Sequence, residues 1–198
     1  MIGPLESPIH KVGIVLLRDA SSDDPLVCLT QVKAKNPDEQ DRVKFGLPKG
    51  TRRYFDPETG HLKDARDFIT ALAHRAQLEP LGACLMHEAQ EEVGLDKRSF
   101  AEHAPRELGP RKFTSETSDD RFDIQWYAMQ ISEVAAARMN PTPSDAHAVR
   151  WVRLSQMQAM HETGEINRSY YPVAVEVVQK MRERSLPLTD FLEALPTR

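Results

Sequence analysis

The chain has 198 residues and an ordinary globular composition, with 40% hydrophobic, 28% charged and 7% aromatic residues, and it is long enough to bury a sizeable core. Its formal net charge of -4 argues against a general nucleic-acid binder, because such proteins usually carry a strongly basic face. The sequence shows neither a signal-peptide pattern nor an apolar stretch long enough to cross a membrane.

These features predict one domain over residues 1–198, with a C-terminal tail over 185–198 and neither nucleic acid nor membrane among its partners. Two cysteines, Cys28 and Cys84, are too few for a disulfide framework and are not spaced as a metal cluster. Such sparse cysteine usage fits a reducing compartment. We therefore expect a cytoplasmic protein.

The first elements in chain order are two strands and a loop. Lys11–Arg18 is a compact aliphatic run typical of a buried strand, and residues 26–32 resemble its returning partner in a hairpin. A Leu-Pro-Lys-Gly loop follows at residues 47–50. Gly50 would let the backbone approach a ligand closely there, because glycine has no Cβ.

Three basic side chains belong to this loop or directly follow it, namely Lys49, Arg52 and Arg53. They are well suited to offset the charge of a phosphate group. For the two arginines, a surface basic cluster is an equally good interpretation. The residues alone leave both interpretations open.

Residues 51–78 carry an aromatic pair, a turn and then a helical pattern. Within 64–77 apolar residues recur at helical spacing, at Phe68, Ile69, Leu72, Ala73 and Ala76. We expect an added amphipathic helix with one of three roles: packing on the core as a satellite, contacting a partner subunit in a homodimer, or covering a substrate cleft as a lid. The first two are favoured, because nothing in the sequence indicates motion.

The next stretch is rich in acids on a helical pattern. Glu88, Glu91 and Glu92 stand at i, i+3 and i+4, a spacing that stacks like charges on one helix face, where they repel. Glu79 adds a fourth acid upstream. Hard divalent cations bind carboxylate oxygens, and Mg²⁺ usually takes one or two carboxylates together with phosphate oxygens. A metal site is therefore one interpretation, and a solvated acidic helix face is the other.

The same stretch contains its own helix signals. A buried side is predicted for Leu81, Leu85, Ala89 and Val93, and Gly94 is placed to end the helix in the left-handed conformation. Downstream, residues 96–111 indicate mixed loop and strand, and 112–120 a polar loop. Strands are predicted at 121–131 and 146–154, and a closing helix at 172–184.

A family resemblance enters at the acidic helix. Glu79, seven residues, then His87-Glu88-Ala89-Gln90-Glu91-Glu92-Val93-Gly94-Leu95 resembles the second half of the Nudix box. That pattern runs Gly, five residues, Glu, seven residues, Arg-Glu-aliphatic-any-Glu-Glu-any-Gly-aliphatic. The loop at 47–50 resembles the one that holds the opening glycine, which we place at Gly50. The resemblance extends from about residue 11 to 184 and implies an α/β (α+β) fold: a Nudix-type α/β/α sandwich with a mixed sheet between helices.

The resemblance also implies a chemistry, namely hydrolysis of the pyrophosphate linkage in a small-molecule nucleoside diphosphate joined to a group X, with Mg²⁺ or Mn²⁺. The implied catalytic residues and metal ligands are Glu88, Glu91 and Glu92, joined in the metal shell by Glu79 and the backbone carbonyl of Lys49. The implied substrate contacts are Lys49, Gly50, Arg52 and Arg53. A further acidic ligand is expected from the second half of the fold, with Glu116, Asp119 and Asp120 as candidates by position, although each alone fits a solvated loop residue.

Two features depart from the family pattern. Residues 51–78 stand where the family usually has five residues, and His87 stands where the family has an arginine that helps orient the catalytic glutamate. Histidine is shorter and only partly charged near neutrality, so it is a weaker substitute for a guanidinium fork. These departures favour an alternative, a Nudix-fold nucleotide-binding or regulatory module with little turnover, whereas the intact acids favour catalysis. An interaction protein with a merely superficial acidic helix would require the Leu-Pro-Lys-Gly loop to be coincidental.

Overall fold

The protein is described by a computed structural model that covers residues 9, 11–32, 44–65, 68–114, 121–140 and 148–188. The expected acidic candidates Glu116, Asp119 and Asp120 lie outside these described residues. Within the described ranges, no helix is both long and apolar enough to cross a membrane.

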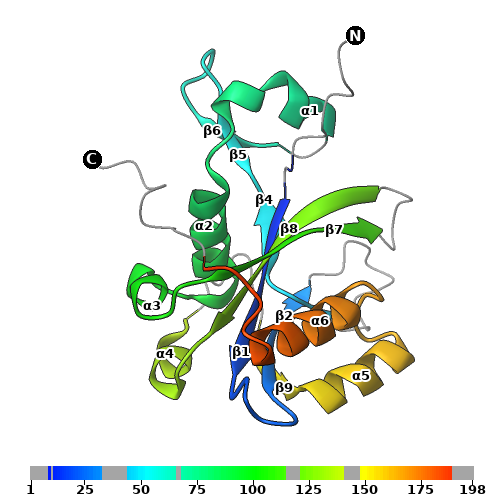
Figure 1. Ribbon diagram of the computed structural model, residues 1–198. Coiled ribbons are helices and arrows are strands. Elements are labelled where there is room, and N and C mark those ends of the chain that lie inside the picture. The colour runs from blue at the N-terminus through cyan, green and yellow to red at the C-terminus, as the bar shows by residue number, and fades with distance from the viewer. Residues whose placement is uncertain are drawn as a thin grey trace.

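A mixed sheet forms the centre of the molecule (Figure 1). Its strands follow the order β3 (Lys44–Gly46), β2 (Leu26–Val32), β1 (Lys11–Arg18), β8 (Arg121–Gln130) and β7 (Arg106–Thr114). Two short strands extend it, β4 (Lys49–Thr51) on β1 and β9 (Val149–Arg153) on β2. The β1–β8 pair is parallel and the other pairs are antiparallel, so the expected mixed sheet is confirmed.

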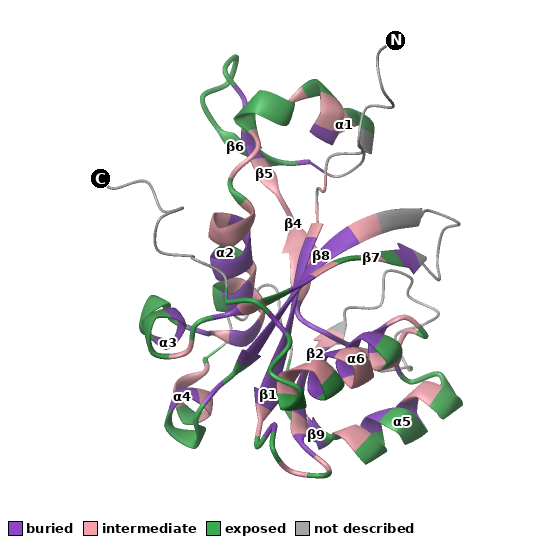
Figure 2. Cartoon of the chain, in the orientation of Figure 1, coloured by how far each residue is buried: buried purple, intermediate pink, exposed green. Residues whose placement is uncertain are grey.

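Helices cover both faces of this sheet. One face carries α2 (Leu81–Val93), α3 (Lys97–Glu102) and α4 (Glu133–Arg138), and the other carries α5 (Leu154–Thr163) and α6 (Tyr170–Arg182) (Figure 1). Because both faces are covered, β1 is an aliphatic run with no polar side, as sheets buried on two faces require. Figure 2 shows the resulting layers, with buried residues along the central strands and exposed ones on the outer helix surfaces.

Close packing between strands β1 and β8 depends on a glycine. A Cβ on Gly13 would lie 2.4 Å from Cζ3 of Trp126, and the Trp126 ring is buried in the core. We expect Gly13→Ala to lower the free energy of unfolding by about 1–3 kcal/mol, the usual cost of overpacking a core. Urea denaturation measures this loss, and an unchanged midpoint would show that Trp126 can move aside.

The segment 51–78 is a small unit beside the main sheet. It contains a hairpin of β5 (Arg53–Phe55) and β6 (Leu62–Asp64), the short helix α1 (Phe68–Ala73) and a 3₁₀ turn at Arg75–Gln77. The expected helix over 64–77 is thus shorter than predicted and accompanied by a hairpin that the sequence pattern did not indicate. A small core of its own joins the two parts, formed by Tyr54, Ala65 and Ala71 with Leu78 packed against it.

This unit also presents apolar side chains to solvent. Phe55, Leu62 and Ile69 are 51%, 57% and 77% exposed. Its small core holds the unit together, while the roles of satellite packing on the main core, lid and dimer contact remain predictions.

Other elements differ from expectation at particular residues. Lys112–Thr114, expected in a polar loop, belong to strand β7. This strand lies at the edge of the sheet, where a proline such as Pro110 is tolerated. Helices α3, α4 and α5 were not predicted, and α3 lies in residues 96–111, which were expected to be mixed loop and strand. Helix α5 buries only Met157 and Met160, which leaves little helical periodicity in the sequence.

Candidate active site

Helix α2 presents the acidic residues to strand β4. Its apolar side is buried as predicted, with Leu85, Ala89 and Val93 at no more than 1% exposure. Gly94 ends the helix with φ 68° and donates its backbone N–H to the carbonyls of Ala89 and Gln90, as expected of a left-handed cap. The acids therefore project from a helix whose rotation is fixed by its buried side.

Helix α2 packs tightly against strand β4 at Gly50. A Cβ on Gly50 would lie 1.7 Å from the carboxyl carbon of Glu88 and 1.8 Å from its Oε2. The missing side chain of Gly50 is thus the space that the Glu88 carboxylate occupies. The Leu-Pro-Lys-Gly segment thus makes room for a side chain of the protein itself.

Lys49 contacts the cluster through both its backbone and its side chain. Its backbone N–H donates to Oε2 of Glu92 at 2.8 Å, and its Nζ lies 6.0 Å from the centre of the Tyr170 ring. Burial lowers the pKa of the Lys49 ammonium, but interactions with Tyr170, Glu92 and Glu88 outweigh burial and raise it above its usual value. Lys49 therefore keeps its positive charge beside two of the carboxylates.

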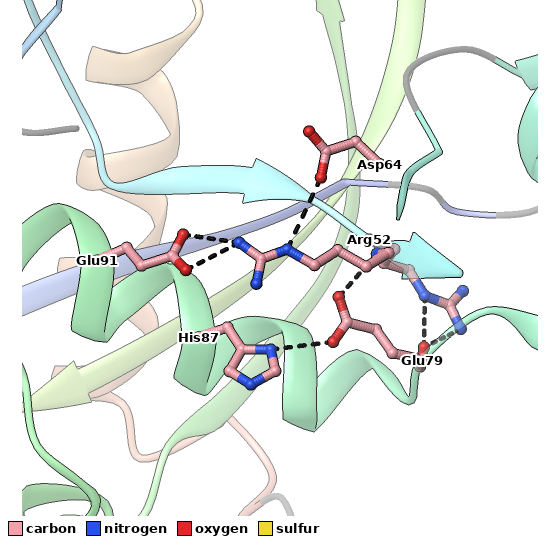
Figure 3. Close-up of polar contacts among 6 residues, drawn as sticks. Arg52, Asp64, Glu79, His87 and Glu91 are labelled. Atoms are coloured by element: carbon pink, nitrogen blue, oxygen red, sulfur yellow. Dashed lines mark hydrogen bonds and ion pairs between the residues drawn. The ribbon is translucent and has the colours of Figure 1, made fainter. Parts of the chain in front are cut away.

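Glu79 ties the start of helix α2 to the neighbouring loop (Figure 3). Its Oε1 accepts the backbone N–H of Arg53 at 2.7 Å, and its Oε2 lies 3.1 Å from Nδ1 of His87. The carbonyl of Glu79 accepts two bonds from the Arg52 guanidinium, at 2.8 Å and 2.5 Å, and a third bond joins Arg52 to the carbonyl of Ile9 at 2.8 Å. Glu79, His87 and Arg52 form a frame that supports the site.

Arg53 places its guanidinium on the acidic face of the helix. Its Nη2 lies 2.8 Å from each Oε atom of Glu91, and its Nε lies 3.7 Å from Asp64 of strand β6. Dashed lines from the labelled Glu91 carboxylate in Figure 3 mark these two contacts. Glu91 therefore has a positive partner supplied by the segment 51–78.

Glu88 is in an electrostatically unfavourable position. Burial, with the nearby charges of Glu92 and Glu91, raises the pKa of the Glu88 carboxyl to about 8. Desolvation and like charges both disfavour the ionised form of an acid. In the metal-free protein at neutral pH, Glu88 is therefore mostly protonated.

This shift predicts a pH-dependent stability. Between the ordinary glutamate pKa of 4.5 and about 8, folded Glu88 keeps a proton that the unfolded chain releases, so rising pH lowers the free energy of unfolding. Glu88→Gln should therefore match wild type near pH 5 and exceed it by about 4 kcal/mol near pH 9. Urea denaturation in EDTA measures both, and equal stability of the two proteins at both pH values would contradict the raised pKa.

The donor set suits a hard divalent cation, because Glu88, Glu91 and Glu92 offer carboxylate oxygens and little else. A bound cation would relieve the repulsion that Glu91 and Glu92 exert on Glu88. In this structure, however, Glu91 is paired with Arg53, and one oxygen of Glu92 accepts the backbone N–H of Lys49. In the part of the chain that the structure describes, no group of three or more His, Cys, Asp or Glu residues is in place to hold a metal ion.

The structure thus brings most of the predicted site residues together, since Glu88, Glu91 and Glu92 adjoin Lys49, Gly50 and Arg53. Arg52 instead has its guanidinium on backbone carbonyls, and His87 contacts Glu79. Two neighbours of the site were missed, Asp64 and Tyr170. Neither carries a sequence signal, because each reaches the cluster only through tertiary packing.

Solved structures of Nudix proteins match this chain over most of its length. A NUDIX hydrolase from Alicyclobacillus acidocaldarius has a TM-score of 0.57 at 14% identity, covering 93% of this chain and 100% of that one. The NUDIX domain of Shewanella oneidensis NrtR, solved in complex with ADP ribose, has a TM-score of 0.52 at 17% identity, covering 93% and 92%. A NUDIX hydrolase from Nitrosomonas europaea has a TM-score of 0.51 at 12% identity, covering 96% and 98%.

Neither models of known protein families nor curated protein sequences give a match. At these identities the structural likeness establishes the fold. The chain has the Nudix fold, and the expected sandwich of a mixed sheet between helices is confirmed.

Proposed function

We propose that the protein is a divalent-metal-dependent hydrolase that cleaves the pyrophosphate linkage of a nucleoside diphosphate joined to another group. The observation that carries this proposal is the placement of Glu88, Glu91 and Glu92 on one helix face, with Glu88 seated against Gly50. A surface acidic patch has no need of a half-buried carboxyl group whose pKa is raised to about 8. Perturbed acids of this kind cluster at functional sites.

The residues have distinct proposed roles. Glu88, Glu91 and Glu92 would hold Mg²⁺ or Mn²⁺, with the Lys49 carbonyl and Glu79 as further candidates. When bound, such an ion offsets the charge of the diphosphate and lowers the pKa of water. Glu88 is the proposed general base, since the pKa of an effective base lies near the working pH.

The basic groups are proposed to bind the phosphates. The ammonium of Lys49 stays charged next to Glu88 and Glu92, and the guanidinium of Arg53 lies at the edge of the same cluster. Phosphate oxygens form strong charge-assisted bonds with both kinds of group. Arg52, bonded to the Glu79 and Ile9 carbonyls, is proposed to position Arg53 and Glu79.

A second candidate function is a nucleotide-binding module with little turnover. It is favoured by the arrangement of Arg53 on Glu91, which leaves the acids without a ready-made ion site. The NrtR domain of similar fold was solved with ADP ribose, so we choose ADP-ribose as the first ligand for both candidates.

A substrate panel separates the two candidates. Product release is measured from ADP-ribose, nucleotide sugars, dinucleoside polyphosphates, coenzyme A and nucleoside triphosphates, each with Mg²⁺, Mn²⁺ or EDTA. The hydrolase proposal expects cleavage of at least one class with either ion and none with EDTA. Tight calorimetric binding of a panel member without cleavage under any condition would instead support the binding module.

A further inference from the structure

Arg53 is anchored through its backbone at two points. Its N–H donates to Oε1 of Glu79 at 2.7 Å, and its carbonyl accepts the N–H of Glu79 at 2.9 Å. Strand pairing sets it opposite Asp64 in the β5–β6 hairpin. The base of this side chain is thus fixed beside helix α2, and only the side chain itself is able to change partner.

The guanidinium of Arg53 contacts both oxygens of the Glu91 carboxylate. One nitrogen, Nη2, lies 2.8 Å from both Oε atoms, so a cation approaching Glu91 meets a positive charge already in place. The pair is partly open to water, with Arg53 24% and Glu91 34% exposed at their side chains. Ion pairs with that much solvent access contribute little and are readily exchanged.

The other two acids lie beside Lys49. Its ammonium is close to Glu88 and Glu92, and its backbone N–H donates to Glu92. The guanidinium on Glu91, in contrast, belongs to Arg53, which comes from the segment 51–78 and not from the helix.

We propose that Arg53 is an internal counter-ion that occupies Glu91 until a divalent cation displaces it, so that the segment 51–78 sets the cation affinity of the acidic cluster. This inference rests on the proposed function, because it takes Glu91 as a metal ligand. After displacement, the anchored Arg53 keeps its guanidinium within side-chain reach of the cluster. Phosphate is the partner to which a freed guanidinium fork is best matched.

The test is a direct titration with Mn²⁺, followed by the electron paramagnetic resonance signal of the free ion, so that binding is read without substrate or turnover. Arg53→Gln removes both the competing contact and the positive charge, and it should lower the Kd for Mn²⁺ about three- to ten-fold. Arg53→Lys keeps the charge without the fork and should give an intermediate Kd. This second variant also guards against a folding defect in the first.

A matched control removes a similar ion pair elsewhere. Arg111 bonds Glu176 at 2.9 Å and 2.5 Å between strand β7 and helix α6, and Arg111→Gln should leave the Kd for Mn²⁺ unchanged. Weaker or equal binding by Arg53→Gln, while wild type binds, would overturn the counter-ion role and leave the proposed function standing. Absence of Mn²⁺ binding in all four proteins would overturn the metal dependence, and the inference with it.

Discussion

Glu88→Gln is expected to lower the rate of hydrolysis by about 10²–10⁴-fold, the contribution typical of a positioned general base. The amide has the shape of the carboxyl group and fits the space at Gly50, so the fold should survive. It cannot accept the proton of an attacking water or carry the charge that a divalent ion requires. Steady-state kinetics on the substrate found with the panel measures the effect.

A control on the same helix separates chemistry from helix stability. Gln90 is exposed on helix α2 between the acids, and Gln90→Ala should change the rate by less than about two-fold, because exposed sites without such partners tolerate substitution. If Glu88→Gln kept most of the wild-type rate, Glu88 would be neither base nor metal ligand.

Gly50→Ala is expected to lower the rate by about 10²-fold, because small displacements of a catalytic group are costly. The added Cβ would lie 1.7 Å from the carboxyl carbon of Glu88, and the flexible end of that side chain has to move away. Since the clash is with this end and not with backbone, the loss of stability should be small. Kinetics and urea denaturation on the same sample give both values.

A double variant shows whether Gly50 acts through Glu88. If it does, adding Glu88→Gln to Gly50→Ala should cost far less than the product of the two separate effects, since groups that act as a unit are not additive. Fully multiplicative losses would mean that Gly50 serves some other contact, such as a direct one with the substrate.

The acidic face was predictable because it depends on local spacing. Glu88, Glu91 and Glu92 lie within two turns of one helix, and Gly94 marks its end, so periodicity alone brings them together. Gly50 was placed by the family resemblance, and the structure gives the physical reason in the space taken by Glu88.

The pairing of Arg53 with Glu91 was not predictable, because 38 positions separate them and a hairpin folds between them. Tyr170 belongs to helix α6, on the other face of the sheet from helix α2, and approaches Lys49 from there. A contact between residues so far apart in the chain leaves no local sequence pattern. The hairpin itself was hidden in segment 51–78, where each of its strands has only three residues. Three residues are too few for the alternation of polar and apolar side chains that identifies a strand.

The structure also shows the surroundings of His87, which stands where the family pattern has an arginine. Its ring contacts Glu79, while Arg53 places a guanidinium on Glu91. The guanidinium expected from the helix is thus absent there, and one is supplied by the inserted segment. This arrangement links the two departures from the family pattern.

The acidic cluster on helix α2 is proposed to make this protein a metal-dependent hydrolase. The most direct test compares wild type with Glu92→Gln on the substrate found with the panel, ADP-ribose first, and separates the products formed with Mg²⁺ and with EDTA. We expect wild type to release the two phosphorylated products with Mg²⁺ but not with EDTA, and Glu92→Gln to release almost none at unchanged thermal stability. Equal turnover by both proteins, or turnover that persists in EDTA, would contradict the proposal.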